Sequence, residues 1–183
     1  MSSPIAELLE DHLLVWDAAE ARRLYAEGFY GKPVGVSKPK QDEFEAPLVL
    51  DPLEGLFLLE KKKIVVRDSN GRDLSVKMFK RQIGKLNKRF ELDYLVYRDL
   101  REKGRVVLSG IRFGCDFAVY DNGPGIDHAP FLVSVMEPDD WVSSTDIVRA
   151  GRLATTVRKR FILAAPNKNS GRIRYLMFDW FKA

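Results

Sequence analysis

The stretch IRFGCDFAVYDNGPGIDHAPFLVSVME (Ile111–Glu137) contains two strand patterns separated by a loop. Its ends, IRFGCDFAVY and FLVSVME, are apolar segments, and the central DNGPG is typical of a turn. We therefore predict two neighbouring strands joined by a loop. Because side chains alternate between the faces of a strand, Tyr120 is expected to point away from the apolar face. That apolar face would carry Ile111, Phe113, Cys115, Phe117 and Val119.

The flanking segments extend these strands into a sheet with helices. Before the stretch, ELDYLVYRDLREKG places its leucines on one helical stripe and ends in Gly104, which suits a C-terminal cap. The segment RVVLS predicts a further strand. After the stretch, STDIVRAGRLATTVRK predicts a helix that runs as far as Lys159, and the strands RFILAA and RIRYLMF follow. The second half is thus predicted as a sheet flanked by helices.

Helix patterns in the first half begin at capping residues. Asp17, Asp51 and Ser75 each precede a helical pattern, and Pro52 occupies the first helical position after Asp51. Short strands are predicted at Leu13–Trp16 and at IVV, before the turn DSNG. The segment Gly31–Pro47 is rich in proline, glycine and charge, and predicts an extended loop.

The helical periodicity is interrupted near residues 84–90, where we place a domain boundary. Residues 1–86 would form a small N-terminal α/β domain with the extended loop 31–47, and residues 87–183 a second domain built on a mixed sheet. The predicted fold class is α/β (α+β).

Composition is that of an ordinary soluble domain, with 45% hydrophobic and 31% charged residues. The apolar runs are too short to cross a bilayer, and the N-terminus lacks the features of a signal peptide, so no membrane association is expected. The single cysteine, Cys115, permits no intrachain disulfide and fits a reducing compartment. These features predict a cytoplasmic protein.

The net charge of +4 is unevenly distributed along the chain. The segments EKKKIVVR, KMFKRQIGKLNKRF and VRKR are basic, whereas KQDEFE and MEPDDW are acidic. A mixed solvated surface explains such a pattern, and the pattern also permits RNA on one face and a protein partner on another.

Several side chains could transfer protons or bind anions. Tyr120 ends one predicted strand, and His128 lies near the start of the next. Histidine is a side-chain type that can give or take a proton in catalysis. Arg152 and Lys159 are seven residues apart and share one face of the predicted helix. For each residue taken alone, packing or a solvated surface is the more common explanation.

Metal or thiol chemistry finds less support in the sequence. There is no HExxH, no paired CxxC and no histidine-rich cluster. Cys115 falls on the predicted core face of its strand, which makes it a poor nucleophile. Asp116 and Glu137 could serve a metal-dependent nuclease, but Pro138 follows Glu137, and no acidic-x-Lys triplet occurs there. No metal or cofactor is predicted.

Three segments in order resemble the catalytic domain of the archaeal tRNA-splicing endonucleases. They are YLVYRDLREKGRVVLSGIRFGCDFAVYD, HAPFLVSVMEPD and RAGRLATTVRKRFILAA, and the similarity covers roughly Tyr94 to Tyr175. The N-terminal half is similar mainly in the order of its strands and helices. The resemblance implies a C-terminal catalytic domain with the mixed sheet of restriction endonucleases.

The resemblance also implies an activity. Members of the family cut precursor tRNA at bulge-helix-bulge intron junctions without a metal ion, leaving 2′,3′-cyclic phosphate and 5′-hydroxyl ends. The family's catalytic Tyr, His and Lys correspond to Tyr120, His128 and Lys159. In this scheme His128 is the general acid and Lys159 stabilises the charge on the phosphoryl oxygens. Tyr120 would be the general base or would orient the 2′-hydroxyl, since a phenol is mostly protonated at neutral pH.

Further residues are implied to bind RNA. Arg152 corresponds to a family arginine that stacks on a bulge base, and Arg172 and Arg174 compete for the role of its partner. Lys38 and Lys40 lie in the extended loop, which resembles an RNA-contacting loop of crenarchaeal members.

The resemblance finally implies a tetramer. The acidic loop with Glu137, Asp139 and Asp140 resembles one that enters a basic pocket of a neighbouring subunit. RIRYLMFDWF resembles a dimerising strand and tail. The extended loop favours two catalytic plus two structural subunits over a homotetramer. Rival hypotheses are a non-catalytic RNA-binding structural subunit of the same assembly, a metal-dependent nuclease and a plain RNA-binding module.

Overall fold

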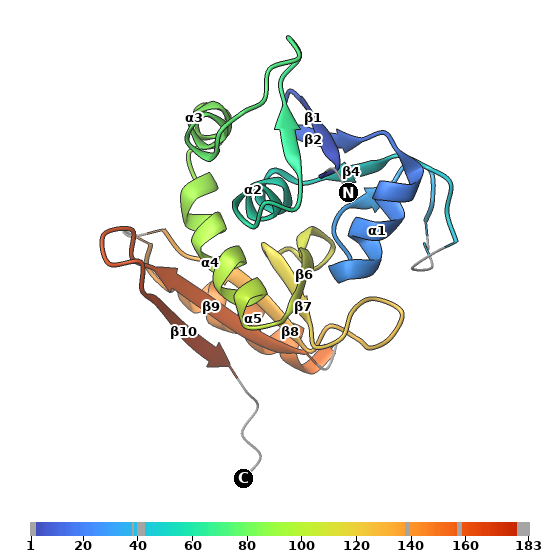
Figure 1. Cartoon of the computed structure of the whole chain (residues 1–183). Coiled ribbons are helices and arrows are strands. Elements are labelled where there is room, and N and C mark those ends of the chain that lie inside the picture. The colour runs from blue at the N-terminus through green and yellow to red at the C-terminus, as the bar shows by residue number, and fades with distance from the viewer. Residues whose placement is uncertain (1–2, 38, 40–42, 138–139, 157–158, 179–183) are drawn as a thin grey trace. The chain divides into compact units, whose positions relative to one another are not determined.

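The computed structural model describes residues 3–37, 39, 43–137, 140–156 and 159–178 (Figure 1). The chain divides into two compact units, residues 1–90 and 91–183. Each unit contains one mixed sheet with helices packed on it, as the predicted fold class requires. No helix in the described part of the chain has the length and apolar character needed to cross a membrane.

The first unit is built on a five-stranded sheet in the order β3-β4-β2-β1-β5. Strand β1 pairs in parallel with β5, and the other pairs are antiparallel. The helices α1 and α2 contact β2, and α3 packs against α2. The strands are β1 (Ile5–Leu9), β2 (His12–Val15), β3 (Lys32–Pro33), β4 (Leu48–Leu50) and β5 (Val65–Arg67).

All three predicted helix starts in this unit are confirmed, and side chains cap them. The Asp17 carboxylate accepts a hydrogen bond from the Glu20 amide (2.9 Å), and the Ser75 hydroxyl accepts one from the Met78 amide (3.3 Å). At Asp51 a full capping box forms with Glu54. The helices are α1 (Ala18–Gly28), α2 (Pro52–Glu60) and α3 (Val76–Leu86).

The strand predicted at Leu13–Trp16 is confirmed for Leu13–Val15 in β2, but Trp16 lies outside it with 60% of its surface exposed, and the preceding strand β1, which forms a hairpin with β2, was missed. The predicted loop 31–47 begins with a short strand, because β3 (Lys32–Pro33) pairs with β4. Strands this short carry too few residues to show a period of two.

The second unit contains a five-stranded sheet in the order β10-β9-β8-β7-β6. Strands β8 and β9 are parallel, and the remaining pairs are antiparallel. The predicted strands RVVLS, FLVSVME, RFILAA and RIRYLMF are all confirmed. The elements are α4 (Phe90–Glu102), β6 (Val106–Ser109), β7 (Phe117–Tyr120), β8 (Phe131–Val135), α5 (Ser144–Thr156), β9 (Arg160–Pro166) and β10 (Ile173–Phe178).

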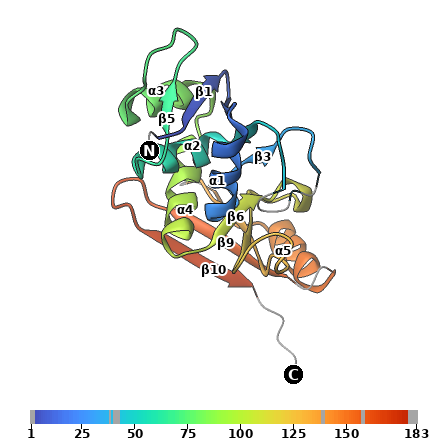
Figure 2. The same ribbon diagram turned by 45° about the vertical axis from the view of Figure 1, so that its right-hand side comes forward.

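The two faces of this sheet are covered by different helices, as Figures 1 and 2 show for α4 and α5. On the α4 face, the rings of Tyr97 and Phe117 lie 6.1 Å apart, and the Tyr175 hydroxyl donates to Asp99 (2.6 Å). Helix α5 packs against β9 and β10. On the face opposite Tyr97, a buried cluster is formed by Ala118, Ala129, Leu132, Phe161 and Leu163.

The prediction of one continuous strand over IRFGCDFAVY was wrong. Ile111–Phe113 form a short 3-10 helix that ends at Gly114 in the left-handed region (φ 70°), and the strand begins only at Phe117. Ile111 is consequently 80% exposed. The side chains of Phe113 and Cys115 pack against the Ala118 cluster, so they do not share a face with Phe117.

A close approach of the backbone explains this break. A Cβ atom on Gly110 would lie 2.6 Å from the Cys115 sulfur and 2.8 Å from the backbone of Phe117, so only glycine fits there without rearrangement. The Asp116 carboxylate accepts a hydrogen bond from the Val135 amide (2.7 Å), which secures the start of β7 against β8. Such contacts join residues distant in sequence, and the local pattern does not reveal them.

Candidate active site

Tyr120 is the last residue of β7 and pairs with Val106 of β6. Its side chain is partly buried and packs against the Ala118 cluster. Burial raises the pKa of its phenol, the charge of Asp127 raises it further, and Arg112 opposes both effects. The Tyr120 hydroxyl therefore keeps its proton at neutral pH.

The loop that follows Tyr120 is held by the side chain of Asp127. Its carboxylate accepts hydrogen bonds from the backbone amides of Asn122 and Gly123, both at 2.9 Å, and from the Asn122 side chain at 3.3 Å. Burial alone would raise the pKa of Asp127, but these hydrogen bonds outweigh it and lower the pKa. Gly123 (φ 134°) and Gly125 (φ 85°) supply backbone conformations that other residues rarely adopt.

His128 directly follows this hydrogen-bonded loop. Its side chain is exposed, whereas the next residue, Ala129, is buried in the cluster. The loop thus presents the imidazole to solvent at a point whose backbone is anchored on both sides. An exposed imidazole on an anchored backbone is accessible to a substrate.

Lys159 lies immediately before β9. Its ammonium group donates a hydrogen bond to the backbone carbonyl of Ala129 and lies 5.3 Å from the centre of the Phe113 ring. Burial lowers the pKa of the Lys159 ammonium. The sequence had placed Lys159 on the same helix as Arg152, and that was wrong: α5 ends at Thr156, and Lys159 has no helical conformation.

The sheet topology brings the three side chains to one edge. Strand β7 runs antiparallel to β8, and β9 runs parallel to β8, so the end of β7 and the starts of β8 and β9 coincide. Arg160 accordingly pairs with Phe131, and its amide donates to the Pro130 carbonyl (2.9 Å). Ala129 connects the group: it follows His128, accepts from Lys159 and packs in the cluster that Tyr120 contacts.

This edge gathers a phenol, an imidazole and an ammonium group, which suit proton transfer and the binding of a negatively charged phosphate. Among the residues that the structure describes, there is no group of three or more His, Cys, Asp or Glu side chains able to hold a metal ion.

Comparison with known proteins accounts for nearly the whole chain. Residues 5–80 match the tRNA intron endonuclease N-terminal domain, and residues 90–175 match the tRNA intron endonuclease catalytic C-terminal domain. The chain belongs to the tRNA intron endonuclease family. It is therefore assigned as an endonuclease by its relationship over both domains.

Individual relatives agree with this assignment along their full length. The chain is 50% identical to a tRNA-splicing endonuclease of Hyperthermus butylicus, over 97% of this chain and 98% of the relative. It is 46% identical to one from Sulfurisphaera tokodaii (97% and 99%) and 43% identical to one from Saccharolobus solfataricus (97% and 98%).

The arginines predicted to bind RNA in this endonuclease lie in different places. Arg152 is exposed on α5. Arg172 lies in the turn before β10, and Arg174 lies on β10 opposite Ala165. Both arginines are exposed near the end of β9 that is remote from Lys159. At 3.3 Å per strand residue, Arg174 lies about 20 Å from Lys159, and Arg172, whose carbonyl accepts from the Asn167 amide, lies about 26 Å away. The fold of one chain therefore does not bring Arg172 or Arg174 to the edge that carries Lys159.

The described ends of the acidic loop, Glu137 and Asp140, are exposed and hydrogen-bonded to each other. The Glu137 amide donates to the Asp140 carboxylate (2.6 Å), and the Asp140 amide donates to the Glu137 carbonyl (3.1 Å). Trp141 follows with 91% of its surface exposed. Asp139, Lys38 and Lys40 lie outside the described residues.

Sequence reasoning missed three features of this site. The Asp127 carboxylate holds the loop by hydrogen bonds, and the Phe113 ring lies beside the Lys159 ammonium. The Ala129 carbonyl accepts a hydrogen bond from that ammonium. The spacing of Asn122 and Asp127 around a Gly-Pro-Gly turn was a usable signal for the first, because Asp side chains commonly bond to nearby backbone amides. Phe113 had been assigned to the wrong face, and a backbone carbonyl leaves no signal in a sequence.

Proposed function

We propose that this chain is the catalytic subunit of a tRNA-splicing endonuclease that cuts precursor tRNA at bulge-helix-bulge junctions. The observation that supports the proposal most directly is the meeting of three strand ends, which carries Tyr120, His128 and Lys159 to one edge of the sheet. Family membership supplies the activity, and these side chains supply the chemistry.

In the proposed reaction, the 2′-hydroxyl beside the scissile phosphate gives its proton to solvent water and its oxygen attacks phosphorus. A bond forms between O2′ and phosphorus, the bond from phosphorus to O5′ breaks, and O5′ takes a proton from the His128 imidazolium. The products are a 2′,3′-cyclic phosphate and a 5′-hydroxyl, and no net water is consumed. An exposed imidazole suits this role because the leaving oxygen arrives with the RNA.

Lys159 would stabilise the negative charge that builds on the phosphoryl oxygens. An ammonium group has three N–H donors, and one of them is used by the Ala129 carbonyl. The other two remain for phosphate oxygens. The carbonyl and the Phe113 ring together limit the directions in which the side chain can point.

Tyr120 would orient the 2′-hydroxyl, with its own proton in place. Burial and the nearby charge of Asp127 both raise the pKa of the phenol, so the tyrosinate needed for a general base is scarce at neutral pH. A protonated phenol still accepts and donates a hydrogen bond, which is sufficient to align O2′ for attack.

We propose that the active assembly contains two copies of this chain and two structural subunits, with a homotetramer as the alternative. Two exposed features support association. Strand β10 is an edge strand whose Leu176 and Met177 are 55% and 49% exposed, and the ring of Trp141, the residue after Asp140, is almost fully exposed. Both features would be covered by neighbouring subunits.

One experiment tests the proposal against its rivals. The purified chain, alone and with candidate partner subunits, is incubated with a bulge-helix-bulge RNA in excess EDTA. Cleavage to cyclic-phosphate ends supports the proposal. Cleavage that EDTA abolishes would indicate a metal-dependent nuclease, and the absence of cleavage in every combination would leave only an RNA-binding role.

A further inference from the structure

The helix α3 in the N-terminal unit carries an unusual series of charges. No acidic residue occurs between Ser75 and Arg89, whereas this segment contains Lys77, Lys80, Arg81, Lys85, Lys88 and Arg89. The Lys80 ammonium is paired with the Glu60 carboxylate at 2.7 Å, so its charge is already compensated. We call the remaining exposed residues Lys77, Arg81, Lys85 and Lys88 the α3 basic stripe.

Three of the stripe residues occupy one side of the helix, and Lys88 follows its C-terminal end. Lys77, Arg81 and Lys85 are spaced by four residues, so they lie about 6 Å apart along the axis and drift by only about 40° per step. Phe79 and Ile83, the buried residues of α3, lie on the opposite side. The helix is thus anchored by its apolar side and presents a row of cations to solvent.

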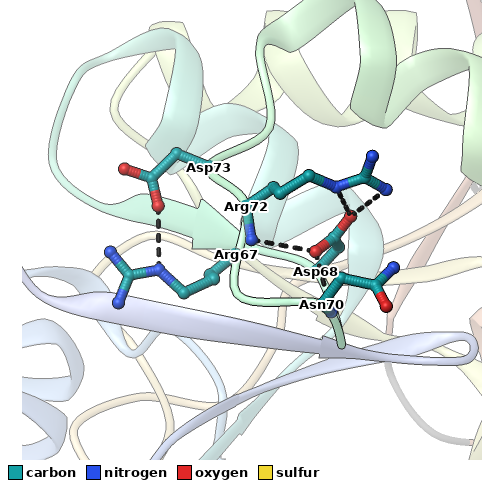
Figure 3. A network of polar contacts seen from close by, with 5 residues as sticks. All are labelled: Arg67, Asp68, Asn70, Arg72 and Asp73. Atoms are coloured by element: carbon teal, nitrogen blue, oxygen red, sulfur yellow. Dashed lines mark hydrogen bonds and ion pairs between the residues drawn. The ribbon is translucent and has the colours of Figure 1, made fainter.

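These cations have no carboxylate partner among the described residues, which distinguishes them from their neighbours. In the turn that precedes α3, Arg67 is paired with Asp73 and Arg72 with Asp68, and Asp68 also binds the backbone of the turn (Figure 3). In this part of the chain, Arg67 and Arg72 each have a carboxylate partner, whereas the charges of the stripe residues are not paired with a carboxylate among the described residues.

We propose that the α3 basic stripe binds the phosphate backbone of the RNA substrate, independently of its sequence. A row of uncompensated cations is complementary to a regularly charged polyanion, because each neutralised phosphate releases a counterion. A protein partner fits less well, since lysine is depleted in protein interfaces. This inference rests on the proposed function for the identity of the RNA, but the contact itself requires no cleavage.

The test compares two variants of the full-length chain with the same net charge. Arg81→Gln/Lys85→Gln removes two stripe residues, and Lys62→Gln/Lys168→Gln removes two exposed lysines elsewhere. The probes are a bulge-helix-bulge RNA with 2′-deoxynucleotides at both cleavage sites and a plain RNA duplex. Neither probe depends on catalysis, so failure of the proposed function leaves the measurement valid.

We expect the stripe variant to bind both probes about tenfold more weakly near 0.1 M salt, with a salt slope of log K reduced by about two units. The control variant should keep the wild-type slope. On a cleavable RNA at saturating enzyme, the stripe variant should keep the wild-type rate constant.

Two results would overturn the inference. The first is an equal loss of affinity in both variants, which would show that only net charge matters. The second is unchanged RNA binding by the stripe variant together with a changed sedimentation coefficient, which would assign the stripe, with the neighbouring exposed Met78 and Leu86, to a protein interface.

Discussion

The ammonium group of Lys159 is hydrogen-bonded to the backbone carbonyl of Ala129, the residue that follows His128. One contact therefore ties the start of β9 to the end of the loop that carries the imidazole. Because β8 and β9 are parallel, both groups enter the sheet at the same edge. The Lys159 side chain is thus held by the backbone next to His128, and a backbone acceptor is stiffer than a flexible side chain would be.

Lys159→Met tests the electrostatic role of this group. Methionine keeps an apolar chain beside Phe113 but removes the charge, so single-turnover cleavage at saturating enzyme should fall by about 10²–10³-fold. Lys168→Met removes an exposed lysine of the same unit and should leave the rate unchanged. A Lys159→Met variant that folds and cleaves normally would contradict the role.

His128→Ala tests the general acid. The rate of the chemical step should fall by about 10²–10⁴-fold while RNA binding is largely retained, because the side chain is exposed and its loss leaves no cavity. The only other histidine, His12, lies in β2 and provides a matched control, His12→Ala, with no expected change in rate. Equal effects of the two substitutions would refute the assignment.

Asp127→Asn tests the loop and the phenol together. Burial of Tyr120 persists in this variant, but the negative charge that further raises its pKa is removed, so Tyr120 should ionise at lower pH than in the wild type. The measurement is ultraviolet titration of tyrosinate, with Tyr120→Phe identifying the signal. Asp121→Asn, which removes an adjacent charge paired with Arg105, should leave the titration of Tyr120 unchanged.

The same variant should loosen the turn. The Asn122 and Gly123 amides donate to the Asp127 carboxylate, and a neutral amide oxygen is a weaker acceptor. Hydrogen exchange at these two amides should accelerate in Asp127→Asn. Because hydrogen bonds lower the pKa of Asp127 below its usual value, the wild-type turn should also loosen as the pH falls through that pKa, whereas Asp127→Asn should not respond to acid there.

Tyr175→Phe tests the link between α4 and β10. The hydroxyl donates to Asp99 at 2.6 Å, and its loss should reduce the free energy of unfolding by about 1 kcal/mol without affecting catalysis. Burial, the hydrogen bond and the charge of Asp99 raise the pKa of Tyr175 above that of an unfolded tyrosine. The stabilisation is therefore complete below about pH 10 and is lost as the pH rises further.

Denaturant unfolding at pH 8 and at pH 10.5 measures this difference. The wild type should lose stability between the two pH values by more than Tyr175→Phe does. An identical pH dependence in both proteins would show that the hydroxyl does not contribute through Asp99. Asp99→Asn should produce an intermediate result, since the acceptor remains but its charge is absent.

Local sequence was most informative where local physics decides the structure. The caps at Asp17, Asp51 and Ser75 were predicted correctly because the side chain and the amides it binds are separated by only two or three residues. The strands RVVLS, FLVSVME, RFILAA and RIRYLMF of the second sheet were also predicted correctly from their apolar residues. The candidate residues Tyr120, His128 and Lys159 were found through resemblance, since each alone was compatible with packing or a solvated surface.

The sequence by itself therefore determined the helix starts, the strand content of the second sheet and the membership of a family with known chemistry. Only the tertiary structure decided that the strand before Tyr120 begins at Phe117, where Gly110 approaches the Phe117 backbone closely and the Asp116 carboxylate accepts a hydrogen bond from the Val135 amide of β8. It also decided that Lys159 leaves the helix and bonds to Ala129. Strand pairing sets those relations through long-range hydrogen bonds, and no periodicity within a single segment encodes which strand ends will meet.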